Sequence, residues 1–448
     1  MKGLIRFLVL VTLVLAAGWF FLKNDTGVAR RISDWAGNSI MHIEALLEER
    51  DTQGSDTSDD SLPYPDDQYS SRLANGADES LADGDGVSVT SGYSISSELV
   101  VSQNGQPAGR RDAFEGEALN GTVSEHMNWV KTVTQKYAPL SWELLMLYDG
   151  LPRNMEAETV DGMTMSSHKS MDSFAFMEGN SAVEMLGSMA TNVHETAHGY
   201  FSDNIFRYAG EKGIQLDWEN VNGFLYLSGS ENYFISFPKK MLFPSRELVG
   251  EIPRELRTFR FETYVAGKTS TQGQGVIGLL DEFHAYYHGA RCSFDLFEAY
   301  ADAEGSEVNG LLEWIRKTQS DMTAYYEFDF FIKEYLLRMQ AVHPGEYEAL
   351  RHCSSFVMAY RSLSTEYSGL VRSYEKRIND EMNELNGSGE YEAEVREGTL
   401  WISYASADGM RSRGTSIFHE DKGTLEPVLM SGRYDKIMSD FLWKSKSR

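Results

Sequence analysis

The sequence contains little cysteine: Cys292 and Cys353 are the only two among 448 residues. A single pair of thiols excludes a scaffold built on disulfide bridges, because small folds of that kind need several bridges. The two residues could form one bridge in an oxidising compartment, or both could be buried thiols. Their separation along the chain does not decide between these alternatives.

Positive charge is also scarce, since 41 Lys and Arg residues stand against 67 Asp and Glu residues, a formal net charge of −26. Proteins that bind nucleic acid through its phosphates carry clustered Lys and Arg, and the sequence shows no such cluster. We therefore expect no nucleic-acid partner. The excess of acidic residues favours solubility.

One long apolar run is present at the N-terminus, where residues 7–22 follow Lys2 and Arg6. The run is slightly short for a spanning helix and slightly long for the core of a signal peptide, and no clear A-x-A cleavage site follows it. We predict that residues 1–26 are a transmembrane anchor or signal segment, and we favour an uncleaved anchor. Positive charge before the run places the rest of the chain outside the cytoplasm, membrane-anchored or, after cleavage, secreted.

Two segments separate this run from the folded part of the chain. Apolar residues at near-helical spacing predict a juxtamembrane amphipathic helix over residues 27–50. Residues 51–123 are rich in Ser, Asp and Gly and have few large apolar side chains, so they cannot bury enough surface to fold. We predict an acidic, disordered linker there.

The remainder, residues 124–448, is predicted to be α+β and predominantly helical. Long periodic segments without internal proline, at residues 307–319, 321–342 and 346–385, predict helices that pack on one another. Alternating apolar residues with Asn-Gly and Gly-Ser breaks at residues 214–237 predict two or three short strands. The strands would form a small β-sheet beside the helices.

The segment NVHETAHGYF, residues 192–201, places two histidines four residues apart. Residues 181–204 have apolar side chains every three or four positions, which predicts an amphipathic helix. His194 and His198 then lie one above the other at the edge of its buried face, where both rings can reach one zinc ion. Glu195 is near enough to touch a water molecule on the metal, as H-E-x-x-H chemistry requires. The alternative is a pair of satisfied, partly buried histidines.

A catalytic zinc needs a third protein ligand and an open position for water. No histidine follows the motif closely, but residues 275–291 form a second amphipathic helical pattern. Glu282 projects from the margin of its buried face, where a carboxylate is costly without a cation or a hydrogen-bond partner. Asp281, His284 and His288 lie together on another face of the same helix and are the alternative ligands.

HETAH followed by a distant helical D-E-F-H-A-Y resembles the gluzincin class of zinc metallopeptidases, whose second motif is a Glu, often with a small residue three positions later, here Ala285. The resemblance covers the two motif helices. It implies a zincin-like catalytic domain with Zn²⁺ as cofactor and Glu195 as the general base. The zinc ligands that it implies are His194, His198 and Glu282.

The chain departs from the best-known gluzincins in the wide separation of its two motifs and in Tyr286, which stands where they have an Asp. The side chains that support the two histidine ligands are therefore unassigned. Tyr286, Tyr287 and His284 are candidates for stabilising the oxyanion, and spacing alone chooses none of them. Many peptidases of this type bind substrate along an edge strand before the motif helix, and residues 173–178 are the candidate for that strand.

The predicted function is a zinc metallopeptidase that hydrolyses peptide bonds outside the membrane, with Glu195 activating a zinc-bound water. Its partners would be a peptide or protein substrate and, through the N-terminal segment, the membrane. Residues 124–305 would be the zinc-binding catalytic domain, and residues 306–448 a helical C-terminal part of the same or a second domain. One alternative is a membrane-tethered, non-catalytic binding or assembly protein that retains a zincin-like fold. The other is a metal-free helical domain.

Overall fold

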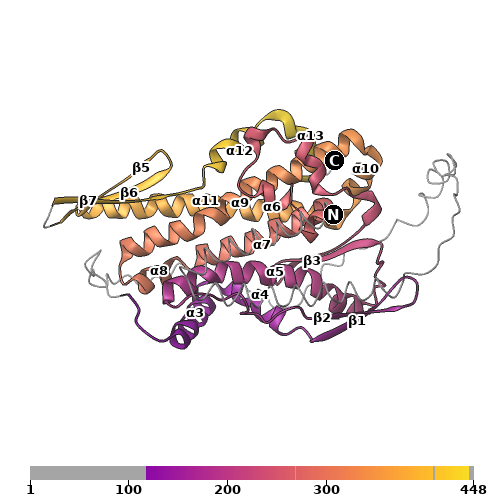
Figure 1. The fold of residues 1–448 in the computed structure, drawn as a ribbon, viewed down its shortest axis with the longest axis horizontal. Helices are drawn as coiled ribbons and strands as arrows, with labels where there is room; N and C mark the ends of the chain where they lie inside the picture. The colour runs from indigo at the N-terminus through magenta and orange to yellow at the C-terminus, as the bar shows by residue number, and fades with distance from the viewer. Residues whose placement is uncertain (1–117, 268, 407–408, 443–448) are drawn as a thin grey trace, which may run out of the picture. The chain divides into compact units, whose positions relative to one another are not determined.

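The computed structural model describes residues 118–267, 269–406 and 409–442 (Figure 1). The predicted anchor or signal segment, the predicted juxtamembrane helix and nearly all of the predicted linker lie outside these residues. The described part is mostly helical with small antiparallel sheets, so the α+β prediction is confirmed. None of the helices in this part has the length and apolarity needed to cross a membrane.

The two sequence motifs lie on two long helices, α5 and α7. The α-helices and β-strands described up to residue 304 are α3 (Val123–Tyr137), α4 (Pro139–Asp149), β1 (Asn154–Glu158), β2 (Thr164–His168), α5 (Ala182–Lys212), β3 (Asn220–Ser228), β4 (Glu231–Pro238), α6 (Phe261–Tyr264), α7 (Gly275–Asp295) and α8 (Phe297–Glu304). The elements that follow are α9 (Glu307–Val342), α10 (Pro344–His352), α11 (Ser354–Ser388), β5 (Tyr391–Arg396), β6 (Thr399–Ser406), β7 (Gly409–Ser416), α12 (Asp421–Leu429) and α13 (Asp435–Ile437).

The first motif lies within α5, whose ends are determined by local chemistry. At its start the Ser181 side chain accepts a hydrogen bond from the Glu184 amide, and the Glu184 carboxylate accepts one from the Ser181 amide. This reciprocal capping satisfies donors that the first turn of a helix leaves free. At its end Gly213 has φ 65°, a left-handed conformation that glycine adopts without a steric penalty. The helix therefore continues unbroken through the histidine motif.

The second motif lies in α7, which packs against α5 on one side and against α9 on another (Figure 1). A Cβ atom on Gly289 would lie 3.0 Å from the carbonyl oxygen of Ala190 and 3.5 Å from Cβ of His194. The missing side chain at Gly289 therefore lets α5 and α7 approach closely. This approach brings the two motifs within reach of each other.

In the described residues, three small antiparallel sheets accompany the helices: the pairs β1–β2 and β3–β4, and the meander β5–β6–β7. Strand β3 packs on α5, where the Phe201 ring occupies the space that a side chain at Gly223 would need. The β3–β4 hairpin has a bulge between Tyr226 and Ser228. It confirms the prediction of strands over residues 214–237.

Two helix boundaries differ from the prediction. Residues 307–319 and 321–342 belong to one helix, α9, because neither proline nor glycine occurs where the two segments join. Residues 346–385 lie in two helices, α10 and α11, because Cys353 has ψ 89° and interrupts the helical backbone.

Residues 173–178 form a turn and an irregular stretch, so the prediction of an edge strand there is wrong. The amide of Ala175 donates a hydrogen bond to the carbonyl oxygen of Asp172 within a turn. The buried Asn192 of α5 accepts a hydrogen bond from the Phe176 amide and donates one to the Ser173 carbonyl. Backbone groups that a strand would offer to a neighbour are thus used by the turn and by α5.

One cluster of buried apolar side chains contains residues from Val130 to Phe441, so both predicted parts of the folded region contribute to it. The two cysteines lie apart in this region as free thiols. Cys292 is fully buried in α7, and Cys353 is partly exposed between α10 and α11. The prediction of two buried, unpaired thiols is therefore confirmed for Cys292, whereas Cys353 is unpaired but only partly buried.

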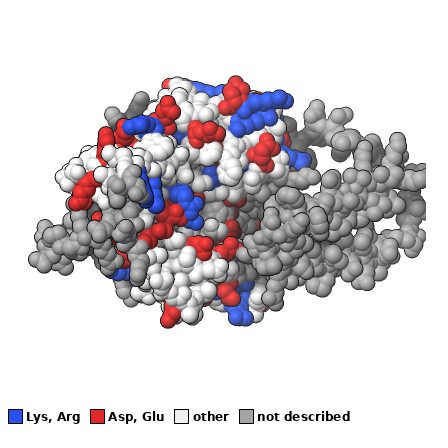
Figure 2. Space-filling view, turned by 60° about the vertical axis from the view of Figure 1, so that its left-hand side comes forward, with Lys and Arg blue, Asp and Glu red and all other residues white. Residues whose placement is uncertain are grey.

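Acidic and basic side chains are interspersed among uncharged ones on the face shown in Figure 2. Two ion pairs are buried beneath the surface. Arg260, directly before α6, pairs with Glu327 of α9 at 2.5 Å, and Lys333 pairs with Asp329 within α9 at 2.6 Å. The guanidinium of the first pair also contacts the ring of Tyr286 in α7, beside the site described next.

Candidate metal centre

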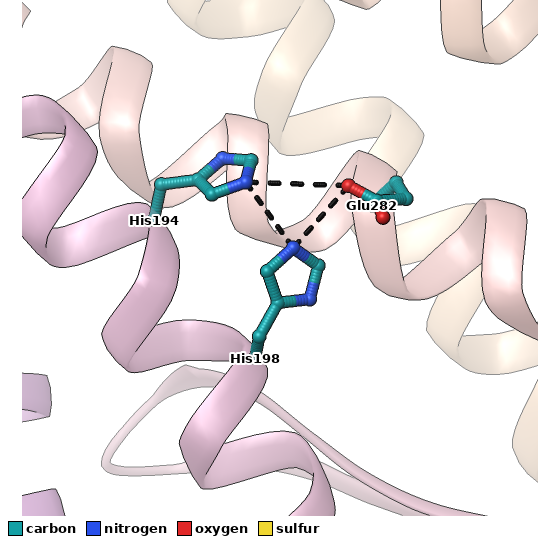
Figure 3. Close-up of side chains that lie close together, drawn as sticks. All are labelled: His194, His198 and Glu282. Atoms are coloured by element: carbon teal, nitrogen blue, oxygen red, sulfur yellow. Dashed lines mark hydrogen bonds and ion pairs between the residues drawn. The ribbon is translucent and has the colours of Figure 1, made fainter. Parts of the chain in front are cut away.

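His194 and His198 point to the same place from consecutive turns of α5 (Figure 3). Their Nε2 atoms are 3.1 Å apart, and their ring planes meet at 78°. Two imidazole nitrogens at this distance can share a hydrogen only if one of them is protonated. They can share a metal ion when both present a lone pair.

Glu282 reaches the same place from α7 (Figure 3). Its Oε2 atom lies 3.2 Å from Nε2 of His198 and 4.0 Å from Nε2 of His194. A tetrahedral zinc ion with bonds of about 2.0 to 2.1 Å separates its ligand atoms by about 3.3 to 3.4 Å. The three atoms can therefore hold one ion after small side-chain adjustments.

The Glu282 carboxylate fits a cation on a second ground. Its Oε1 accepts a hydrogen bond of 3.1 Å from Oγ1 of Thr271, whereas its buried Oε2 makes no hydrogen bond in the described structure and faces the Nε2 atoms of His198 and His194. A buried carboxylate oxygen without a donor is costly unless a cation neutralises it. The side chains of His194, His198 and Glu282 are 12%, 21% and 7% exposed, so the cluster also has access to solvent.

Asp281 supports His198 from behind. Its Oδ2 lies 3.0 Å from Nδ1 of His198. A carboxylate in this position accepts the Nδ1–H group and leaves the Nε2 lone pair free for a metal. The sequence left Asp281 as an alternative ligand, and the structure places it beside Nδ1 of His198, on the side of the ring away from the other candidate ligands.

Without a bound cation, burial and the neighbouring charges shift the pKa values of the two histidines in opposite directions. Burial lowers the pKa of His194 well below its ordinary value, and the nearby charge of His198 adds to this. Burial acts on His198 in the same direction, but Asp281 and Glu282 outweigh it and raise the pKa of His198 well above its ordinary value. A divalent cation would displace the His198 proton, and it would then balance the two negative charges of the Glu282 and Asp281 carboxylates beside two neutral imidazoles.

Glu195 follows His194 on α5 and is partly buried. Burial raises the pKa of its carboxyl; the charge of His198 opposes this shift, and Glu282 and Asp281 reinforce it. A raised pKa makes the Glu195 carboxylate a stronger base than an exposed one, which suits it to accept a proton from a nearby water molecule.

Two tyrosines and an arginine line the other side of His194. The Tyr286 ring meets the His194 ring edge-on, with centroids 4.5 Å apart, and its hydroxyl lies 3.0 Å from the hydroxyl of Tyr264. The Arg260 guanidinium lies 4.4 Å above the Tyr286 ring and is held by Glu327. Burial raises the pKa of Tyr264, so its hydroxyl keeps its proton. Sequence reasoning missed Tyr264 and Arg260, because their segment has no periodic pattern.

The remaining candidates from the sequence lie elsewhere. Nε2 of His284 and Nε2 of His288 both approach the carbonyl oxygen of Tyr226 in β3, each at 2.7 Å. Tyr287 packs against Tyr367 of α11, with ring centroids 5.6 Å apart. The structure therefore gives neither histidine the place of a third ligand, and of the candidate oxyanion donors it leaves Tyr286 beside the cluster.

Comparison of the chain with models of known protein families, with curated proteins and with solved structures gives no match. Any function is therefore inferred from the residues of the site and their geometry.

Proposed function

We propose that this protein is a zinc-dependent metallopeptidase in which His194, His198 and Glu282 hold the metal and Glu195 is the general base. The observation that carries this proposal is the triangle of Nε2, Nε2 and Oε2 atoms, with sides of 3.1, 3.2 and 4.0 Å. Two imidazoles and one carboxylate form a common ligand set of catalytic zinc, and they leave a coordination position for water.

The ligand set alone does not single out zinc, because two histidines and one carboxylate also bind non-heme Fe(II). The position of Glu195 favours hydrolysis. It follows the first ligand on the same helix, it is partly buried, and burial raises its pKa. Hydrolysis of a peptide bond requires proton transfer to the leaving amine, and a base in this position can supply it.

The bound metal would polarise the scissile carbonyl and make the attacking water more acidic. Glu195 would accept a proton from that water and deliver it to the leaving nitrogen. The hydroxyl of Tyr286 would donate a hydrogen bond to the oxyanion while accepting one from the hydroxyl of Tyr264, and Arg260 would add positive charge behind Tyr286. Asp281 would keep His198 in the tautomer that binds the metal.

We further propose that this chemistry takes place outside the cytoplasm, on a peptide or protein substrate. The proposal rests on the N-terminal sequence alone, where Lys2 and Arg6 precede the apolar residues 7–22. Membrane attachment through residues 1–26, or secretion after cleavage, follows from the same pattern.

The experiment compares the wild-type protein with Glu195→Gln in metal content and in hydrolysis of a mixture of unstructured peptides. We expect one zinc per chain in both proteins and a rate lower by about 10²- to 10⁴-fold in the variant. Glu211→Gln is the matched control, because Glu211 lies on the same helix in an exposed pair with Arg207. Full activity of Glu195→Gln would refute its role as base. Zinc binding by a wild-type protein that cleaves none of the peptides would favour the non-catalytic binding protein.

A further inference from the structure

Two buried histidines of α7 share one backbone carbonyl. His284 and His288 are both fully buried, and Nε2 of each lies 2.7 Å from the carbonyl oxygen of Tyr226 in β3. A carbonyl oxygen has two lone pairs and no proton, so both Nε2–H groups donate to it. The two rings can meet at one oxygen because they lie one turn apart on the helix.

Packing alone does not account for this pair. Nδ1 of each ring is buried without a hydrogen-bond partner in the described structure. Two apolar side chains of similar size would fill the same volume without leaving two acceptors unsatisfied. The imidazoles add direction, since two hydrogen bonds to one oxygen restrain both the height and the rotation of the helix that carries them.

The carbonyl that they share lies at a junction of three elements. Tyr226 directly precedes the bulge in β3. Its ring stacks on the His288 ring at 5.9 Å and 25°, and meets the Tyr200 ring of α5 edge-on at 5.9 Å. Strand β3 is thus tied to both of the helices that carry the proposed metal ligands.

We propose that His284 and His288 are positioning residues for the metal centre: their clamp on the Tyr226 carbonyl sets the rotation of α7 and so the place where Glu282 and Asp281 meet α5. Since side chains extend about 6 Å from a helix axis, a rotation of about 10° moves a carboxylate by about 1 Å. Metal–ligand bonds tolerate deviations of about 0.2 Å. This positioning role rests on the metal site of the proposed function, but it does not require peptidase activity.

The experiment measures metal binding by the purified full chain. Zinc dissociation constants are obtained by competition with a chelator, and cobalt(II) is added to the metal-free protein to record its visible absorption spectrum. The double variant His284→Leu/His288→Leu removes both donors, whereas His284→Gln/His288→Gln keeps an N–H group at the end of each side chain. His126→Leu is the matched control: His126 is 5% exposed and its Nδ1 lies 3.0 Å from the Asn180 carbonyl oxygen, away from α7.

We expect all leucine variants to unfold at lower temperature than the wild type. Zinc affinity should fall about 10- to 100-fold in the His284→Leu/His288→Leu protein, with a changed cobalt spectrum. The glutamine double variant should recover most of that affinity, and His126→Leu should bind zinc as the wild type does. If the double leucine variant does not fold, the single variants His284→Leu and His288→Leu are each expected to lose part of the affinity.

The proposal is wrong if the leucine variants of His284 and His288 have the same zinc affinity and cobalt spectrum as His126→Leu. The two histidines would then have a structural role only. A wild-type chain that binds neither metal would overturn the clamp together with the metal site. A wild-type chain that binds zinc and hydrolyses no peptide would refute the peptidase proposal alone, because both readouts of the clamp concern metal binding.

Discussion

Replacing Asp281 with asparagine tests whether this residue contributes to metal binding or to the stability of the metal-free fold. Asp281 is 6% exposed, and its Oδ2 lies 3.0 Å from Nδ1 of His198. Asparagine keeps an oxygen that can accept the Nδ1–H group, so a charge-assisted hydrogen bond, worth about 1.5 to 3 kcal/mol, becomes a neutral one, worth about 0.5 to 1.5 kcal/mol. Loss of a carboxylate behind a histidine ligand weakens metal binding about 10- to 100-fold, or about 1.4 to 2.8 kcal/mol, and the lower end of this range matches the weakened hydrogen bond.

The same substitution should leave the metal-free fold intact. Burial raises the pKa of Asp281, and Glu282 adds to the shift although His198 opposes it. A raised pKa means that folding disfavours the ionised carboxylate at neutral pH. A neutral amide avoids this cost, which offsets the weaker interaction with His198, so the metal-free Asp281→Asn protein should melt close to the wild-type temperature.

The assay pairs chelator competition for zinc with thermal unfolding of the metal-free chain. Asp295→Asn is the control, because Asp295 lies on the same helix, is 10% exposed and pairs with Arg291 at 2.7 Å. We expect weaker zinc binding in Asp281→Asn only. Zinc affinity equal to that of the wild type and of Asp295→Asn would refute the role assigned to Asp281.

Two further changes test the surroundings of the site. Gly278→Ala places a Cβ atom 1.9 Å from the carbonyl oxygen of Thr271, so the loop that contains Thr271 must move and Glu282 loses its hydrogen bond from the Thr271 hydroxyl. We expect this variant to lose about 1 to 3 kcal/mol of stability and to bind zinc more weakly. The control Gly345→Ala adds a Cβ atom that meets only open space, so it should be neutral or stabilising. Chemical denaturation and chelator competition check this, and equal behaviour of the two variants would contradict it. Burial lowers the pKa of His288 to about 4 in the folded chain. A histidine in the unfolded chain has a pKa of about 6.5, so the metal-free fold should lose about 3 kcal/mol of stability as pH falls from about 6.5 to about 4. Urea unfolding across that range should show a shallower loss for His288→Gln, and an unchanged slope would count against the assignment.

The two motif helices are predictable from the sequence because their causes are local. Ser181 and Glu184 cap α5, and apolar residues every three or four positions define its buried face. The same periodicity defines α7, and a carboxylate at the margin of its buried face marks Glu282 as a residue in need of a partner. The structure brings Glu282 to His194 and His198, as the sequence analysis expects.

The surroundings of the cluster depend on tertiary contacts that leave no periodic signal. Asp281 meets His198 because of the relative rotation of α5 and α7, which sequence spacing does not determine. Tyr264 comes from a short helix in an irregular segment and reaches the site only through packing on Tyr286. The strand expected over residues 173–178 is absent because Asn192 of α5 captures two of its backbone groups.

Anomalous diffraction from a zinc-loaded crystal of the full chain, recorded at the zinc absorption edge, tests most directly whether the three side chains bind one ion. The geometry predicts a single peak about 2.0 to 2.2 Å from Nε2 of His194, Nε2 of His198 and an oxygen of Glu282. A crystal without a peak at this place, or with zinc held by other side chains, would contradict the assignment of the metal centre.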